Sequence, residues 1–341
     1  MIFYAGNILS KHGYTPTFIE TLTPKLSEYY KIISVSDKKN QIHRMLDMIY
    51  HFFKNKKSIE VTLIDSYSMR AFWYTYILSK LCHLYHIPYI PILRGGGYPD
   101  RLKESKKDCD FIFKNSVKNI SPSMYLKTHF EKENYPVEYI PNFIPLENYK
   151  FKMRSVLKPK LLWVRSFDAT YNPVLAIDIL KILKKKYPGA VLCMVGPDKD
   201  GSLEKVKQKA VDSGVIEYIK FAGRMSKPDW IKLSEEYDIF INTTNFDNHP
   251  VSVIEAMALG IPVVSTNVGG IPFLIENDID GLLVKPNDAE EFAVKIEKLL
   301  KDNQLSENIS VNARNKAAEF DWENVKRSWF EILDPYIKKE K

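Results

Sequence analysis

The chain has 341 residues, of which 45% are hydrophobic and 27% charged, and its formal net charge is +7. The length suits two domains better than one, and the composition is that of a folded globular protein, which excludes a disordered chain. The three cysteines are scattered without a CxxC pair. The sequence therefore predicts neither a disulfide framework nor a zinc site, and it favours a reducing, cytoplasmic setting.

The positive charge is concentrated in the N-terminal half. Residues 1–150 hold 21 Lys and Arg against 14 Asp and Glu, a net of +7, whereas residues 151–341 hold 28 of each, a net of zero. This excess of positive charge has two open interpretations: a surface that faces phosphates, or an ordinary solvated surface. Nucleic acid is not predicted as a partner, because the excess is modest and no recognition motif accompanies it.

Membrane insertion is not predicted either. The N-terminus lacks the basic-then-apolar layout of a signal peptide. The longest apolar region, residues 71–93, is interrupted by Lys80, His83 and His86, whereas a span needs about 20 apolar residues. Residues 44–57 form a basic amphipathic pattern with two interpretations. One is an ordinary helix packed on the first sheet; the other is a helix that lies on the inner face of an anionic membrane or covers a lipid-linked acceptor.

In the N-terminal half, apolar runs separated by helical stretches predict strands at residues 2–5, 31–35, 61–64 and 89–93. Residues 142–159 lack a strong period and form the predicted linker. The C-terminal half alternates more regularly, with predicted strands at residues 161–164, 190–195, 216–221, 239–241, 261–264 and 282–284. Helix-start signals between these strands are at Asn172, Gly201, Ser226, Pro250 and Asn287.

This alternation predicts an α/β protein with two Rossmann-like, doubly wound parallel sheets in tandem. The predicted domains are residues 1–150, residues 151–320, and a C-terminal helix in residues 321–341 that packs back on the first domain. Ligands bind beyond the carboxyl ends of the strands in such sheets. The cleft between the two domains is therefore the expected active site.

The most informative segment is residues 245–270, NFDNHPVSVIEAMALGIPVVSTNVGG. Pro250 at the first helical position leaves the initial N–H groups directed out of the helix, which suits a phosphate. Glu255 lies in an otherwise apolar helix and needs a partner, either a ribose diol or a neighbouring Arg or Lys. Because Asp247 precedes the helix, we expect the two carboxylates about 10 Å apart at 1.5 Å of rise per residue. That separation favours opposite ends of one elongated ligand over a glycosidase pair, which spans roughly 5–9 Å.

At these residues the sequence resembles the E-x7-E region of retaining family-4 glycosyltransferases with the GT-B fold, of the bacterial polysaccharide and glycolipid type. The resemblance covers about residues 160–300, where Val195-Gly196-Pro197, Phe221-Ala222-Gly223-Arg224 and residues 280–284 (DGLLV) follow in the family's order. It implies a transfer that needs neither metal nor cofactor, from a UDP- or GDP-sugar to a hydroxyl of a glycan or lipid-linked glycan.

The resemblance also implies roles for single residues. Arg165 would neutralise the departing diphosphate, Asp247 would hold the transferred sugar, and Glu255 would hold the ribose hydroxyls. The other donor contacts that it implies are Asn248, His249, Pro250, Val251, Ser252, Gly196, Pro197, Gly223, Arg224, Met225, Gly6 and Asn7. In the loop after the fourth strand, the implied acceptor-side residues are Arg94, Gly95 and Gly96, whose glycines permit close approach of a ligand.

Three positions depart from the family pattern. Asp247 is one methylene shorter than the usual Glu, and Arg94 stands where His is frequent. The lysine usual a few residues after Arg165 is missing from residues 168–173 (DATYNP), so Arg224 or a cation of the N-terminal domain would have to substitute. Two alternatives follow: a catalytically degenerate GT-B subunit that binds a nucleotide or glycan without turnover, or a GT-B sugar-nucleotide epimerase. His249 has no HxxE, HxH or DxD companion and is not predicted to bind a metal.

Overall fold

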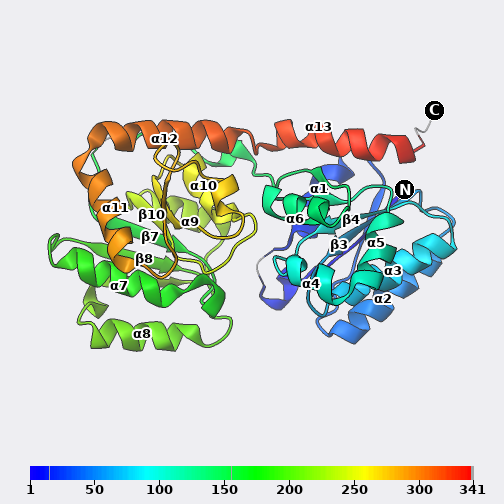
Figure 1. The fold of residues 1–341 in the computed structure, drawn as a ribbon, viewed down its shortest axis with the longest axis horizontal. Helices are drawn as coiled ribbons and strands as arrows, with labels where there is room; N and C mark the ends of the chain where they lie inside the picture. Colours follow the sequence, from blue (N-terminus) through cyan, green and yellow to red (C-terminus); the bar gives the residue numbers. More distant parts are fainter. Residues whose placement is uncertain (15, 155, 339–341) are drawn as a thin grey trace. The chain divides into compact units, whose positions relative to one another are not determined.

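The computed structural model describes residues 1–14, 16–154 and 156–338, and the chain divides into two compact units (Figure 1). Unit 1 comprises residues 1–142 and the chain from Val325 onward, and unit 2 comprises Phe143–Asn324. Residues 339–341 of the predicted C-terminal segment lie outside the described residues.

Unit 1 is built on a six-stranded parallel sheet in the order β2-β1-β3-β4-β5-β6. Its strands are β1 Ile2–Ala5, β2 Ile32–Val35, β3 Val61–Ser66, β4 Tyr89–Leu93, β5 Ile120–Ser121 and β6 Glu138–Tyr139. Its helices are α1 Phe18–Ser27, α2 Gln41–Asn55, α3 Phe72–Leu84, α4 Tyr98–Glu104, α5 Lys106–Lys114 and α6 Met124–Lys132. The four predicted strands are confirmed to within two residues, whereas β5 and β6 were not predicted.

The core of unit 1 follows from the alternation of side chains along its strands. Phe3 of β1 packs with Met48 and Phe52 of α2 and with Leu78 of α3, all fully buried. The C-terminal helix α13 (Trp322–Leu333) supplies Trp329, whose buried ring lies 6.2 Å from that of Phe18 in α1. Residues more than 300 positions apart in the chain thus complete one core.

Unit 2 has a second parallel sheet, in the order β12-β11-β10-β7-β8-β9. Its strands are β7 Lys160–Val164, β8 Val191–Val195, β9 Ile219–Gly223, β10 Ile239–Asn242, β11 Val263–Thr266 and β12 Leu282–Val284. Its helices are α7 Pro173–Lys184, α8 Ser202–Asp212, α9 Lys227–Ser234, α10 Val251–Ala258, α11 Ala289–Lys301 and α12 Asn303–Ala318.

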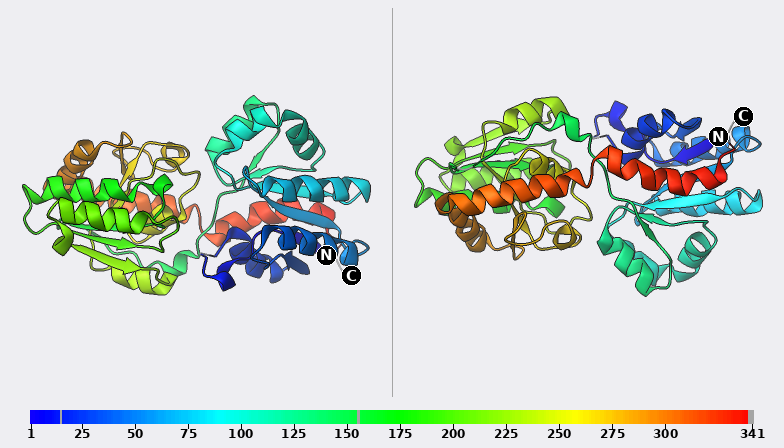
Figure 2. Two further views of the ribbon diagram at one scale, coloured as in Figure 1. Left: turned by 90° about the horizontal axis from the view of Figure 1, so that it is seen from below. Right: turned by 90° about the horizontal axis from the view of Figure 1, so that it is seen from above.

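Both faces of the unit 2 sheet are covered, as its nearly continuous apolar strands require. Trp163 and Met194 belong to the apolar cluster that contains α7, α8 and α11. Leu162 and Phe240 belong to the cluster on the other face, with α9, α10 and α12. Figures 1 and 2 show the sheet between α7 (green) and α12 (orange).

Three predicted boundaries in unit 2 were wrong for local reasons. The strand predicted at residues 216–221 begins only at Ile219, because Ile216–Tyr218 form a 3-10 turn. The strand predicted at residues 261–264 begins at Val263, after Pro262, which has no N–H to donate to a sheet. Helix α10 begins at Val251, so Pro250 is its N-cap residue rather than its first helical residue.

The strand orders place one switch point in each unit. In unit 2 the chain order reverses between β7 and β10, and in unit 1 it reverses between β1 and β3. Loops that leave the carboxyl ends of the two strands at a switch point diverge to opposite faces and leave room for a ligand. The residues that follow β7 and β10 therefore define the first place to look for a site.

The two ends of unit 2 are tied to each other. Ile144 donates its N–H to the carbonyl of Phe320 (2.9 Å) and accepts from the N–H of Trp322 (3.1 Å). The chain therefore enters and leaves unit 2 at neighbouring points.

Candidate active site

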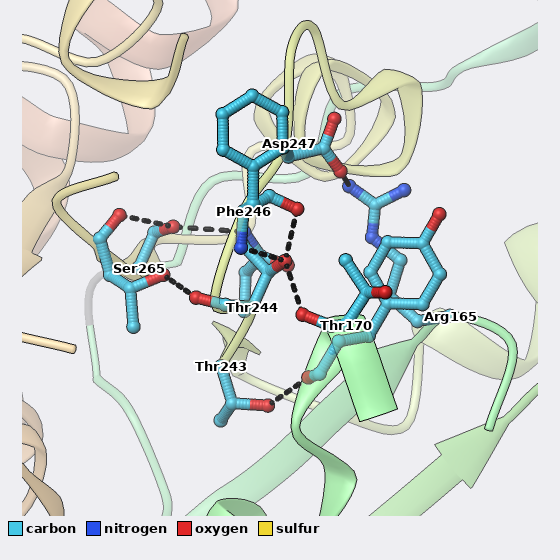
Figure 3. Close-up of polar contacts among 10 residues, drawn as sticks. Arg165, Thr170, Thr243, Thr244, Phe246, Asp247 and Ser265 are labelled. Atoms are coloured by element: carbon cyan, nitrogen blue, oxygen red, sulfur yellow. Dashed lines mark hydrogen bonds and ion pairs between the residues drawn. The ribbon is translucent and has the colours of Figure 1, made fainter. Parts of the chain in front are cut away.

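Arg165 and Asp247 meet at the switch point of unit 2. Arg165 directly follows β7, and Asp247 lies in the loop after β10. The Arg165 guanidinium points at the Asp247 carboxylate and forms an ion pair with it (Figure 3). It also lies over the ring of Tyr171, 4.9 Å from the ring centre. Its Nε is buried and has no hydrogen-bond partner among the described residues, so one donor remains for a ligand.

The loop after β10 is fixed by two buried threonines (Figure 3). Thr243 Oγ1 accepts from Trp163 Nε1 (3.0 Å) and lies 2.9 Å from the carbonyl of Asn172. Thr244 Oγ1 donates to the carbonyl of Phe246 (2.7 Å), and the Thr244 carbonyl accepts from Thr266 Oγ1 (2.6 Å). Satisfied buried polar groups of this kind hold a loop in one conformation. Asp247 is thus presented from a rigid support that the sequence did not predict.

Asp247 and Asn248 are enclosed by a pair of glycines. The N–H of Gly270 donates to the carbonyl of Asp247 (2.8 Å). A Cβ on Gly270 would lie 1.7 Å from the carbonyl oxygen of Asn248, and one on Gly269 would lie 2.2 Å from that of Asp247. Only glycine allows the backbones to approach this closely.

Replacing Gly270 by Ala should therefore destabilise the protein by about 3 kcal/mol, because the new methyl group must displace the Asp247–Asn248 backbone. The melting temperature, followed by circular dichroism, should fall by roughly 6–12 °C. Gly189→Ala is the matched control, since nothing lies within 4 Å of a Cβ there. Equal melting temperatures for the two variants would contradict this account of the loop.

The start of α10 adjoins the same loop. Pro250 caps the helix without a side-chain acceptor. Ser252, in the first turn, is buried, and its Oγ has no hydrogen-bond partner among the described residues. A buried hydroxyl beside the positive end of a helix dipole suits an anionic ligand. His249 is also buried, and its ring lies edge-on to Phe320 with the ring centres 5.4 Å apart.

Glu255 is buried in the middle of α10 and has two partners within unit 2. Its Oε1 accepts from the hydroxyl of Tyr149 (2.7 Å) and forms an ion pair with Lys227 Nζ. Burial and the neighbouring Glu255 carboxylate raise the pKa of Tyr149, which keeps this phenol protonated as a donor. The Lys227 side chain is 51% exposed, so it can leave the carboxylate and become hydrated. A neighbouring Arg or Lys was one of the two expected partners of Glu255, and Lys227 is such a cation. The sequence did not single out Lys227, and Tyr149 was not expected.

Gly196, which follows β8, lies against the backbone of Arg165, and Gly223 at the end of β9 adjoins Gly196. The Arg165 N–H donates to the carbonyl of Val195 (3.0 Å), and a Cβ on Gly196 would lie 1.7 Å from the Arg165 carbonyl oxygen. Gly196 in turn donates to the carbonyl of Gly223 (2.8 Å). Pro197 accepts from the N–H of Phe167 (2.8 Å), and Met225 packs on the apolar cluster behind α10.

Thr170 lies in the segment 168–173, which lacks the lysine expected from the family resemblance. Its carbonyl accepts from the N–H of Asn245 (2.8 Å), which joins the segments after β7 and β10. A cation that contacts this segment is Lys199, whose Nζ lies 2.6 Å from the Asp168 carboxylate. Lys199 was not considered from the sequence as a substitute for the missing lysine.

The predicted residues of unit 1 gather at its own switch point. A Cβ on Gly6 would lie 2.8 Å from Oδ2 of Asp65, a fully buried carboxylate on β3 whose pKa burial raises. Asn7 Oδ1 accepts from Arg44 Nη1 (2.8 Å). Arg94 is mostly engaged inside the unit: its Nε contacts Asp65 (3.4 Å), its Nη1 donates to Asn142 Oδ1 (2.6 Å), and its guanidinium lies 3.3 Å from the ring centre of Phe18.

The two glycines after Arg94 differ in environment. A Cβ on Gly95 would lie 2.3 Å from the backbone N of Ser68. Close packing against Ser68 is therefore sufficient to require glycine at position 95. Gly96 is half-buried. An acceptor-side role for this loop remains a prediction.

Residues 147–316 match the family model described as "Glycosyl transferases group 1". A D-inositol 3-phosphate glycosyltransferase of Mycobacterium marinum is 30% identical over 167 residues, which are 48% of this chain and 36% of that protein. An N,N'-diacetylbacillosaminyl-diphospho-undecaprenol alpha-1,3-N-acetylgalactosaminyltransferase of Campylobacter jejuni is 30% identical over 128 residues, 38% of this chain and 33% of that protein. The matched part thus spans less than half the length of these curated relatives.

Unit 2 is a group 1 glycosyl transferase domain. Among solved structures, Anabaena Alr3699/HepE in complex with UDP is similar over 98% of this chain and 99% of its own, with a TM-score of 0.78 and 16% identity. A sucrose-phosphate synthase from Thermosynechococcus elongatus has a TM-score of 0.81 at 13% identity, over 98% of each chain. These likenesses and the two parallel sheets confirm the predicted α/β GT-B fold.

The group 1 domain brings Arg165, Asp247, Ser252, Gly196 and Gly223 to one edge of its sheet. None of its helices, nor any other helix in the described part of the chain, is both long enough and apolar enough to cross a membrane. Within residues 1–14, 16–154 and 156–338, no group of three or more His, Cys, Asp or Glu side chains is arranged to hold a metal ion.

Proposed function

We propose that the protein transfers a sugar, with retention and without a metal ion, from a nucleoside-diphosphate sugar to a hydroxyl of a glycan or lipid-linked glycan. The observation that carries this proposal is the pair of buried donors without partners, Arg165 Nε and Ser252 Oγ, beside the Arg165–Asp247 ion pair. A guanidinium N–H after β7 and a hydroxyl in the first turn of α10, both buried and without a partner among the described residues, favour a diphosphate ligand. The HepE structures that hold UDP and UDP-glucose make a UDP-sugar the first donor to test.

In the proposed mechanism, the diphosphate lies at the start of α10 and the ribose hydroxyls bind the Glu255 carboxylate in place of Lys227. The bond between the anomeric carbon and the phosphate oxygen breaks as the acceptor oxygen bonds to the same carbon on the same face. The leaving phosphate accepts the acceptor's proton. Arg165 offsets the charge that develops on this phosphate, so its interaction is strongest in the transition state. Asp247, held by the glycine pair, orients the sugar.

The Campylobacter relative is named for an acceptor linked to a diphospho-polyprenol, and this supports a lipid-linked glycan as the acceptor class. The amylovoran biosynthesis glycosyltransferase AmsK of Erwinia amylovora, 25% identical over 201 residues, supports a role in polysaccharide synthesis. The absence of a lysine from residues 168–173 favours a second candidate, a subunit that binds the nucleotide without turnover.

A thermal-shift panel of UDP, GDP, ADP and their glucose conjugates tests the proposal. A nucleotide at 100 times its Kd stabilises the native state by about 2.7 kcal/mol, and the melting temperature should rise by several degrees for the correct base. The donor so identified is then incubated with lipid-linked acceptors, and product is followed by mass spectrometry. If no nucleotide raises the melting temperature, the donor site is wrong. If a nucleotide binds but no sugar is transferred, the second candidate replaces the first.

A further inference from the structure

Helix α2 exposes an apolar stripe in addition to its buried face. Ile42, Leu46, Tyr50 and Phe53 are 70%, 58%, 60% and 41% exposed. At 3.6 residues per turn these four positions fall within an arc of about 80°. The buried face of α2, with Met48 and Phe52, lies on a different side of the helix and packs in the core of unit 1. Single exposed apolar residues are common on proteins, but a continuous stripe indicates an interaction surface.

The aromatic end of the stripe carries lysines. Lys56 Nζ lies 4.2 Å from the ring centre of Tyr85 and 5.4 Å from that of Phe53, and Lys54 Nζ lies 5.9 Å from that of Tyr50. The rings of Phe53 and Tyr85 are themselves in edge-to-face contact at 5.8 Å. Aromatic rings with ammonium groups beside them match the boundary between acyl chains and headgroups.

The surrounding segment is strongly basic. Residues 38–57 contain six Lys and Arg (Lys38, Lys39, Arg44, Lys54, Lys56 and Lys57) against one acidic residue, Asp47. Arg44 is turned inward to Asn7, and Lys38 forms an ion pair with Asp37, which leaves Lys39, Lys54, Lys56 and Lys57 in the segment that carries the stripe. An anionic surface is the complement of this arrangement.

A second copy of the chain is a poorer occupant. In a two-fold symmetric contact the same patch meets itself, and the lysines of one stripe would then face those of the other. Like charges brought together in this way oppose association.

We propose that this α2 face, defined by Ile42, Leu46, Tyr50 and Phe53 with the adjoining lysines, docks the protein on an anionic lipid bilayer. The apolar side chains enter the headgroup boundary, and the lysines contact lipid phosphates. The Asn7 loop at the unit 1 switch point is bonded to α2 through Arg44, so a docked helix holds that loop next to the lipid surface.

The test is co-sedimentation of the full chain with vesicles of equal phosphatidylglycerol and phosphatidylcholine, compared with vesicles of phosphatidylcholine alone. We expect binding to the anionic vesicles that weakens as salt rises. The double variant Leu46→Gln/Tyr50→Gln should bind at least tenfold more weakly, as should Lys54→Gln/Lys56→Gln/Lys57→Gln. The matched control is Val211→Gln/Val294→Gln, which replaces exposed apolar residues on α8 and α11 of unit 2. It should bind like the unaltered protein.

Three results would overturn the proposal. The first is the absence of binding to anionic vesicles at low salt, and the second is an equal loss of binding in the control variant. The third is a dimer, measured by light scattering, that Leu46→Gln/Tyr50→Gln dissociates, since the occupant would then be a second copy. Melting temperatures of the variants, and their thermal shift with nucleotide, show that each remains folded. Because nucleotide binding is measured separately, failure here leaves the proposed transferase activity standing.

Discussion

Replacing Glu255 by Gln should weaken donor binding about 100-fold, equivalent to roughly 2.7 kcal/mol. Glutamine preserves the volume of the buried side chain and still accepts from Tyr149, so the α10 core should remain intact. The charge is lost, and with it the charge-assisted hydrogen bonds proposed for the ribose hydroxyls. We expect the loss mainly in the KM of the donor and in the Kd of the free nucleotide, measured by calorimetry.

The control for this variant is Glu297→Gln. Glu297 pairs with Lys186 and Lys301 on the surface of α11, where an ion pair contributes little. Its donor KM should match that of the unaltered enzyme. An unchanged donor KM in Glu255→Gln would remove this carboxylate from the binding site.

Replacing Arg165 by Met should lower kcat about 10³-fold, equivalent to roughly 4 kcal/mol of transition-state stabilisation. The guanidinium is proposed to meet charge that appears only as the glycosidic bond breaks, so donor KM should change much less than kcat. Arg165→Lys should retain part of the rate, because it keeps the charge but loses the planar group over Tyr171. Initial rates of nucleoside-diphosphate release, with acceptor present, measure both variants.

Lys209→Met is the matched control for the arginine, since it breaks an ion pair with Asp178 between α7 and α8. That variant should turn over normally. A normal kcat in Arg165→Met, with an unchanged melting temperature, would exclude the proposed role of the arginine.

Much of the architecture could be predicted, because apolar runs bounded by Pro, Gly and capping residues mark strands and helices locally. Ser226 caps α9 as predicted, through a hydrogen bond from the N–H of Asp229 (3.3 Å). The strands β5 and β6 were missed because two residues are too few to show an alternation. Pro262 delays the start of β11 because it has no N–H to donate to the sheet, a signal that is present in the sequence itself.

The partners of the site residues could not be predicted, since contacts between distant segments leave no local pattern. Tyr149 lies in the predicted linker, 106 positions from Glu255, yet it contacts the carboxylate. Lys227 stands at the start of α9, 28 positions from Glu255, so nothing local in the sequence connects the two side chains. The two threonines after β10 offered one usable signal, as adjacent hydroxyl residues directly after a buried strand often hold a loop.

The hydrogen bonds between the two ends of unit 2 bear on the order in which the two units fold. Unit 2 is an insertion between residues 142 and 325 of unit 1, and its contacts close as soon as Phe320 and Trp322 reach Ile144. Unit 1 still lacks Trp329 at that moment. We therefore expect unit 2 to complete its fold first during vectorial synthesis, and unit 1 to be completed last. If synthesis is stalled just after Asn324 has left the ribosomal exit tunnel, the nascent chain should contain a protease-resistant unit 2 and an incomplete unit 1.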